Sequence, residues 1–148
     1  MTNLAEIFGE PISVYTREQA IEDGVLVDVS ETSEYKESGW RMPVAIEAEA
    51  WEKCVAVDKG LEEQGQSIAG RLWDVLYMAS LYAKRAGQTD VIYMKVSVTS
   101  HRESKNGNHL PGYKQVTRNL KITCGPGDNA EPVITIGIFN GKLTTRRR

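Results

Sequence analysis

The stretch QSIAGRLWDVLYMASLYAKR, Gln66 to Arg85, is the longest uninterrupted helical pattern in the chain and decides the fold. Ser67 is suited to cap its N-terminus, and Gly87 follows the cations Lys84 and Arg85, where a C-cap glycine is expected. Apolar residues recur at spacings of three and four, in one stripe: Ile68, Leu72, Val75, Leu76, Ala79, Tyr82, Ala83 and Ala86. This stripe predicts a long helix that packs on the core.

A second row of large apolar residues lies on another side of the same helix: Trp73, Tyr77, Met78 and Leu81. Left bare, this row would be a patch for a partner; covered by N-terminal elements, it would belong to the core. We expect it to be covered, because large exposed apolar patches are uncommon on monomers. Arg71 and Asp74 lie between the two rows, where we expect a surface or helix-end pair and not a catalytic couple.

Beyond the helix, apolar and polar residues alternate, as in strands that bury one face. Three segments show this pattern: Val91 to Thr99, Tyr113 to Cys124 and Pro132 to Phe139. Arg118 is the exception on the apolar face of the second segment. Ser100 to Gly112 joins the first two; its length and its Asn106-Gly107 turn signal predict a mobile connection. Gly125 to Asp128 predicts a tight turn, because it has no Walker lysine and leads into a strand.

The first 65 residues predict short elements. They are a strand at Ile12 to Tyr15, a helix after the capping box Thr16 to Gln19 that stops at Gly24, a strand at Val25 to Val29, a helix at Glu31 to Glu37 capped by Ser30, an extended Val44 to Ile46, a helix at Glu47 to Val55, and a polar connector at Asp58 to Gly65. Asp28 and Glu31 fit a helix cap and a first-turn acid better than metal ligands.

Together these elements predict an α+β fold. A three-stranded antiparallel β-meander from the C-terminal half packs on the long central helix, and short N-terminal strands and helices cover the helix from its other side. With 148 residues, the chain is expected to form a single domain over 1–148, with a frayed basic tail at 140–148.

Composition is typical of a soluble globular protein, with 41% hydrophobic and 26% charged residues. No run is long and apolar enough for a membrane span, and the first residues lack signal-peptide features, so we expect a cytoplasmic protein with no membrane contact. Cys54 and Cys124 have no CxxC partner and the only histidines are His101 and His109. We therefore expect buried free thiols, no metal site and no cofactor.

The net charge of −2 hides an asymmetry between the two halves of the chain. Residues 1–66 contain 15 acidic and 5 basic residues, a balance of −10, and residues 67–148 contain 5 acidic and 13 basic residues, a balance of +8. Such halves either attract each other or form separate faces for different partners. The residues predicted to bind a partner come from both halves: Glu18, Glu22, Glu34, His101, Arg102, Lys105 and Lys114.

Two other functions are weighed against partner binding. An enzyme would pair His101 with Glu103, Asp128 or Glu131, where the 100–112 loop meets the 125–131 turn. The sequence holds no nucleophile elbow and no HExxH spacing, so we name no catalytic residue and lean against an enzyme.

The other alternative is a nucleic-acid-binding accessory protein. Between Lys95 and Lys121 there are six Lys/Arg residues and a single acid, Glu103, which would suit phosphate contact. Because no helix-turn-helix, zinc-finger or ribonucleoprotein motif accompanies them, nucleic acid is not the favoured partner.

Four blocks resemble an uncharacterised family, a domain of unknown function, found in small bacterial, plasmid and phage proteins. They are YTREQAIEDGVLVDVS at 15–30, PVAI at 43–46 with Trp51 and Cys54, GRLWDVLYMA at 70–79 and GPGDNAEPVITI at 125–136. The resemblance brings no catalytic residue, and the segment from Ser97 to Tyr113 is longer and more basic than the family leads us to expect.

The resemblance implies a setting on mobile elements, whose small proteins often bind host machinery. By this analogy we expect a non-enzymatic phage or mobile-element accessory protein that binds a host protein, such as an inhibitor of a CRISPR-type defence system. The acidic half would mimic nucleic acid toward a basic host surface, or the basic loop would dock on an acidic one. The oligomeric state is left open.

Overall fold

The structure is a computed structural model that describes residues 15–141. The predicted strand from Ile12 and the end of the basic tail lie outside these residues. One five-stranded sheet forms the centre, in the order β1-β2-β5-β4-β3. Its strands are β1 (Leu26–Asp28), β2 (Val44–Glu47), β3 (Val91–Glu103), β4 (His109–Pro126) and β5 (Pro132–Ile138).

The β-meander is confirmed, because β3 pairs antiparallel with β4, and β4 with β5. The sheet is larger than the predicted three strands, because two N-terminal strands extend it. β2 runs parallel to β5, with Val44 opposite Ile134, and β1 pairs antiparallel with β2. Val44 to Ile46 are buried without alternation, as is typical of a strand covered on both faces.

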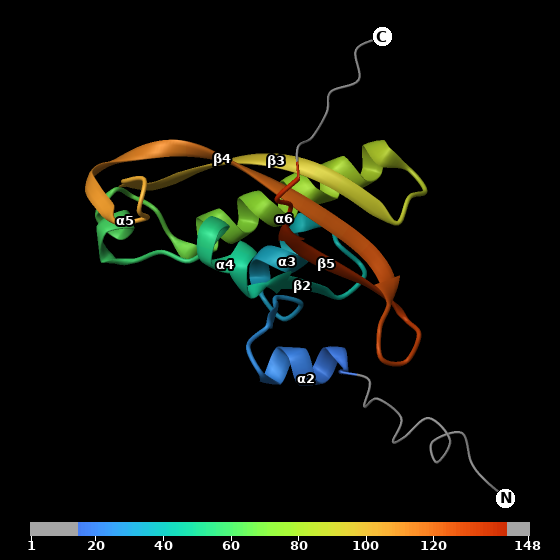
Figure 1. The fold of residues 1–148 in the computed structure, drawn as a ribbon. Coiled ribbons are helices and arrows are strands. Elements are labelled where there is room, and N and C mark those ends of the chain that lie inside the picture. Colours follow the sequence, from blue (N-terminus) through green and yellow to red (C-terminus); the bar gives the residue numbers. More distant parts are fainter. Residues whose placement is uncertain (1–14, 142–148) are drawn as a thin grey trace, which may run out of the picture.

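The described residues form five helices (Figure 1): α2 (Arg17–Glu22), α3 (Ser33–Ser38), α4 (Ala48–Cys54), α5 (Lys59–Glu63) and α6 (Ile68–Ala86). The capping box of α2 is confirmed, with Thr16 and Gln19 exchanging both hydrogen bonds. α3 is capped by Thr32, and not by Ser30 as predicted, because the Ser30 hydroxyl bonds to the backbone of Val44.

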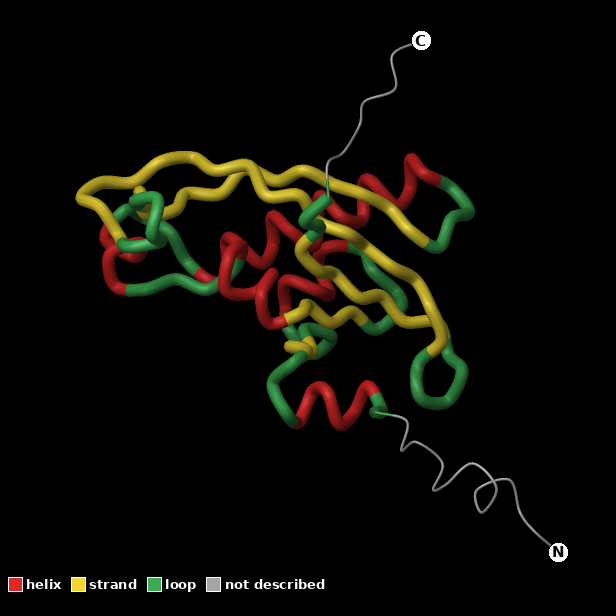
Figure 2. The backbone as a smooth tube through the Cα atoms, viewed as in Figure 1, coloured by secondary structure: helices red, strands yellow, loops and turns green. Residues whose placement is uncertain are grey.

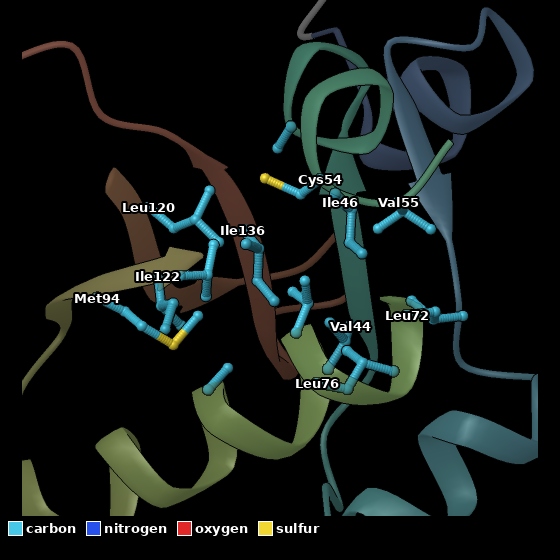
Figure 3. Close-up of a cluster of buried hydrophobic side chains, with 14 of the residues drawn as sticks. Val44, Ile46, Cys54, Val55, Leu72, Leu76, Met94, Leu120, Ile122 and Ile136 are labelled. Carbon is cyan, nitrogen blue, oxygen red and sulfur yellow. The ribbon is translucent and has the colours of Figure 1, made fainter. Parts of the chain in front are cut away.

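The long helix follows its prediction at both ends, with Ser67 as N-cap and Gly87 as C-cap. Its core stripe is confirmed along the middle of the helix, and its side chains meet those of the sheet and α4 in one cluster (Figure 3). The two ends of the stripe are exceptions: Ile68, in the first turn, is 47% exposed, and Ala86, the last helical residue, is also exposed. No helix of the described residues 15–141 is both long and apolar enough to cross a membrane.

The second row of the long helix is only half covered. Met78 and Leu81 are partly buried, but Trp73 and Tyr77 are 36% and 39% exposed, so the prediction of a covered row is wrong for these two. Their rings stack on each other, 4.6 Å apart and 11° from parallel. The stack hides part of each ring from water without help from another element.

Arg71 does not form the surface pair predicted with Asp74. It is only 7% exposed, and its guanidinium donates to the carbonyl oxygens of Lys53, Cys54 and Thr99. The side chain therefore ties the end of α4 and the edge of β3 to α6. Asp74 remains exposed.

The predicted mobile loop at 100–112 is mostly strand. β3 continues to Glu103 and β4 begins at His109, so the turn itself is 104–108, with Gly107 at φ 80°. The two strands form a long curved ribbon whose closed end bends toward α5 (Figure 2). Most side chains near this end are exposed, so no apolar alternation marked the strands in the sequence.

Candidate functional site

The end of the ribbon, residues 100–114, is fastened to α5. Asp58 caps α5 by accepting a hydrogen bond from the backbone N–H of Leu61 at 2.9 Å. Its other carboxylate oxygen lies 2.6 Å from Nε2 of His101 on β3. The polar connector predicted at 58–65 is therefore a short helix whose cap residue also binds the ribbon. We call residues 100–114 the ribbon end.

Aromatic rings extend this contact across the ribbon. His101 stacks on His109, with ring centroids 4.2 Å apart, and lies 4.9 Å from the tilted ring of Tyr113. Gly60 leaves room for them, because a Cβ there would come within 2.5 Å of the Tyr113 hydroxyl. The hydrogen bond from Leu61, followed by that with His101, lowers the pKa of Asp58 from its usual value.

A cavity of about 390 Å³ opens between α4, α5 and the ribbon, and we call it the ribbon cavity. Asp58, His101 and His109 lie on its wall, together with Arg71 and Arg118. Nε of Arg118 is buried and has no hydrogen-bond partner among the described residues. Arg118 thus places a guanidinium against a cavity at the strand position where alternation predicts an apolar residue.

Cys54 lies beside these two arginines. Burial raises the pKa of its thiol to about 11, although the charges of Arg118, Arg71 and Lys53 act in the opposite direction. The prediction of a buried free thiol is confirmed for Cys54; Cys124 is free but only partly buried. Burial also lowers the pKa of Arg71, and the charge of Arg118 adds to this effect.

The seven predicted binding residues do not form one surface. Arg102, Lys105 and Lys114 are exposed at the ribbon end, which also carries His101. Glu18 and Glu22 lie on α2, which sits at a different end of the molecule (Figure 1). Glu34 lies on α3. The three cations therefore share the ribbon end, whereas the three acids are divided between two helices away from it.

The alternative enzyme site, in which His101 would pair with an acid of the 125–131 turn, does not form. The ribbon end and the 125–131 turn lie at opposite ends of β4, an 18-residue strand. Asp128 instead accepts hydrogen bonds from the backbone N–H groups of Arg17 and Glu18, at 2.8 and 3.0 Å, and so holds the start of α2. The carboxylate that meets His101 is Asp58.

Sequence reasoning missed Asp58, Arg71 and Arg118 as members of a site. The acid before Lys59 signals a helix cap, but nothing local connects it to a histidine 43 residues away. A charged residue on an apolar face was the one available signal for Arg118. Among residues 15–141, no three His, Cys, Asp or Glu side chains are grouped to hold a metal ion.

Comparison with known proteins gives one finding. The model of a family described as a family of unknown function, DUF6573, matches residues 1–141. No curated protein and no solved structure gives a significant match. The match covers nearly the whole sequence, and its description assigns no activity.

Proposed function

Because the chain belongs to DUF6573, a family of unknown function, its role must be inferred from its own surface. We propose that it is a non-enzymatic binding protein whose ribbon end docks on an acidic surface of a host protein. The proposed setting is the bacterial cytoplasm, with the protein supplied by a phage or another mobile element. A component of a defence system, such as a CRISPR effector, is one class of partner that fits this setting.

The exposed cations of the ribbon end carry this proposal. Arg102, Lys105 and Lys114 occupy one end of the sheet, and Glu103 is the single acid between residues 100 and 114. Each exposed charge contributes little to affinity, about 0.2 to 1 kcal/mol in a salt bridge. Several like charges on one protruding element nevertheless speed association with an oppositely charged surface and exclude partners of the same sign.

The attachment to α5 gives the ribbon end a defined shape. The His101–Asp58 contact and the His101–His109 stack hold the two strands against a helix before any partner arrives. A surface that is ordered in advance loses less conformational entropy on binding. This favours recognition by a preformed surface over folding upon binding.

The test uses affinity capture from bacterial lysate with three full-length proteins: wild type, Arg102→Glu/Lys105→Glu/Lys114→Glu and Glu18→Lys/Glu22→Lys/Glu34→Lys. The two variants carry the same number of charge reversals, on separate surfaces. Three reversals of two charges each change the net charge from −2 to −8 in the first and to +4 in the second. The lysate is treated with nuclease so that captured proteins are not bridged by nucleic acid.

The proposal predicts that the ribbon-end variant loses a protein that the wild type and the acidic-surface variant both retain. Loss in the acidic-surface variant alone would contradict it and would assign binding to the nucleic-acid-mimicking face. A partner captured only from a parallel lysate without nuclease would also contradict it, because the bound molecule would then be nucleic acid. Circular dichroism of all three proteins confirms that each is folded.

A further inference from the structure

Two guanidinium groups reach the ribbon cavity without a carboxylate partner. Arg71 and Arg118 both line it, yet the ion pairs among residues 15–141 are Lys53–Glu49 and His101–Asp58. Arg71 is buried, uses its donors on three backbone carbonyls and forms no ion pair with a described carboxylate, although the charge of Asp58 acts favourably on it. A buried charge without a counter-ion is unfavourable unless another group supplies the opposite charge.

Arg118 lines the cavity and has a donor that no described residue satisfies. Its Nε–H is buried without a partner among the described residues, although native proteins satisfy nearly all buried donors. It stands opposite Val96 in the β3–β4 register, among residues that face the core. A guanidinium edge with a free donor matches an oxyanion well, because it offers directed hydrogen bonds together with charge.

We propose that the ribbon cavity binds one small oxyanion, a phosphate or carboxylate group, held by Arg118 against the charge of Arg71. The volume of about 390 Å³ suits a small molecule. Glu52, Asp58 and Glu103 also line the cavity, so it carries negative charge of its own. Lys53 lines the cavity as well, so three carboxylates face three cations, a balance that disfavours extended polyanions.

The proposed site uses other arginines than the docking surface, because neither Arg71 nor Arg118 belongs to the exposed set of the ribbon end. The two regions are neighbours, since His101 and His109 also line the cavity. The anion would come from a free metabolite-sized molecule or from an acidic side chain of a bound protein. Both sources share the same oxyanion chemistry. Inorganic phosphate and acetate are the probes for the two kinds of group.

The experiment follows the Nε–Hε resonances of the arginines in a ¹⁵N-labelled full-length protein by heteronuclear NMR. Sodium phosphate or sodium acetate is added while sodium chloride keeps the ionic strength constant. The expected result is a saturable shift of the Arg118 Nε–Hε peak with at least one of the two anions. Saturation by phosphate alone identifies a phosphate site, and saturation by acetate alone identifies a carboxylate site.

Two variants separate binding at this site from general attraction of anions. Arg118→Gln should weaken binding by at least about tenfold, whereas Arg102→Gln, an exposed arginine of the ribbon end, should leave it unchanged. Arg118→Lys keeps the charge but lacks the Nε donor and should also weaken binding. This variant serves if Arg118→Gln does not fold.

Three results would overturn the proposal: a linear drift without saturation, a saturable shift that spares Arg118, or equal weakening by Arg102→Gln and Arg118→Gln. The titration of the wild-type protein tests the proposal even if neither variant folds. Failure here leaves the docking proposal intact, because charge reversal at Arg102, Lys105 and Lys114 does not alter Arg118. Failure of the docking test likewise leaves this site intact.

Discussion

His101 and Asp58 are 43 residues apart in sequence, and their side chains meet at 2.6 Å. This contact joins the ribbon end to the N-terminus of α5 and forms part of the wall of the ribbon cavity. Asp58 contributes twice, because its second oxygen caps the helix. The geometry of the proposed docking surface therefore depends on one carboxylate.

Asp58→Asn should loosen the ribbon end without removing the helix cap, because asparagine caps helices as well as aspartate does. It removes the negative charge that faces His101. The expected result is faster amide hydrogen exchange in residues 100–114 at neutral pH. Global stability should change little, because the Asp58 side chain is 52% exposed to solvent. Unchanged exchange in this segment would show that the contact does not order the ribbon.

The pH dependence of this contact follows from the lowered pKa of Asp58. A carboxyl group whose pKa falls on folding stabilises the folded protein above its unfolded pKa of 3.8. That contribution is lost as the pH falls through the lower folded pKa. Exchange in residues 100–114 of the wild type should therefore approach that of Asp58→Asn only below pH 3.8. Convergence of the two proteins near pH 6 would contradict this assignment.

Gly60→Ala should disturb the ring cluster specifically. An added methyl group would come within 2.5 Å of the Tyr113 hydroxyl and 3.2 Å of the His101 ring. The ring can swing away, so we expect shifted His101 and Tyr113 resonances and not global unfolding. Gly125→Ala is the control, because a Cβ at Gly125 meets nothing within 4 Å. Identical ring resonances in Gly60→Ala and the wild type would refute the described packing.

Arg71→Met should destabilise the protein by about 3 kcal/mol, because three carbonyl groups lose their donor and each net hydrogen bond contributes about 1 kcal/mol. Asp74→Asn, on the exposed side of the same helix, should change stability by less than about 0.5 kcal/mol. Urea unfolding of both variants measures the difference. Equal effects would favour the surface pair that the sequence predicted.

Cys54 should resist alkylation in the folded protein. With a thiol pKa of about 11, roughly one molecule in a thousand carries the reactive thiolate at pH 8. In a Cys124→Ser background, iodoacetamide should modify Cys54 slowly at pH 8, faster as the pH approaches 11, and rapidly in urea. Mass spectrometry gives the rates. Equal rates with and without urea at pH 8 would show that the thiol is accessible.

Local patterns predicted the elements that depend on neighbours in sequence. Ser67 and Gly87 bound the long helix, Thr16 and Gln19 form their capping box, and the three C-terminal strands pair as a meander. In each case the signal is periodicity or a cap within a few residues. Because each of these elements buries one face, its apolar residues recur at the spacing of a helix or a strand.

Features that depend on distant partners were not predicted. The parallel pairing of Val44 with Ile134 joins segments 90 residues apart. A run of three apolar residues does not indicate which strand it will pair with. The burial of Arg71 depends on carbonyl groups brought by α4 and β3. The same limit applies to the candidate site at the ribbon end. The exposed cations were predicted from the sequence but Asp58 was not, because a contact between a carboxylate and a distant histidine leaves no local pattern.

The central claim is that the exposed cations of the ribbon end dock on an acidic protein surface. Its most direct measurement is the association rate constant between the captured partner and the wild type or Arg102→Glu/Lys105→Glu/Lys114→Glu, across a range of salt concentrations. We expect the wild-type rate to fall as salt rises, and the variant to associate at least about tenfold more slowly at low salt. Equal, salt-independent rates for the two proteins would contradict it.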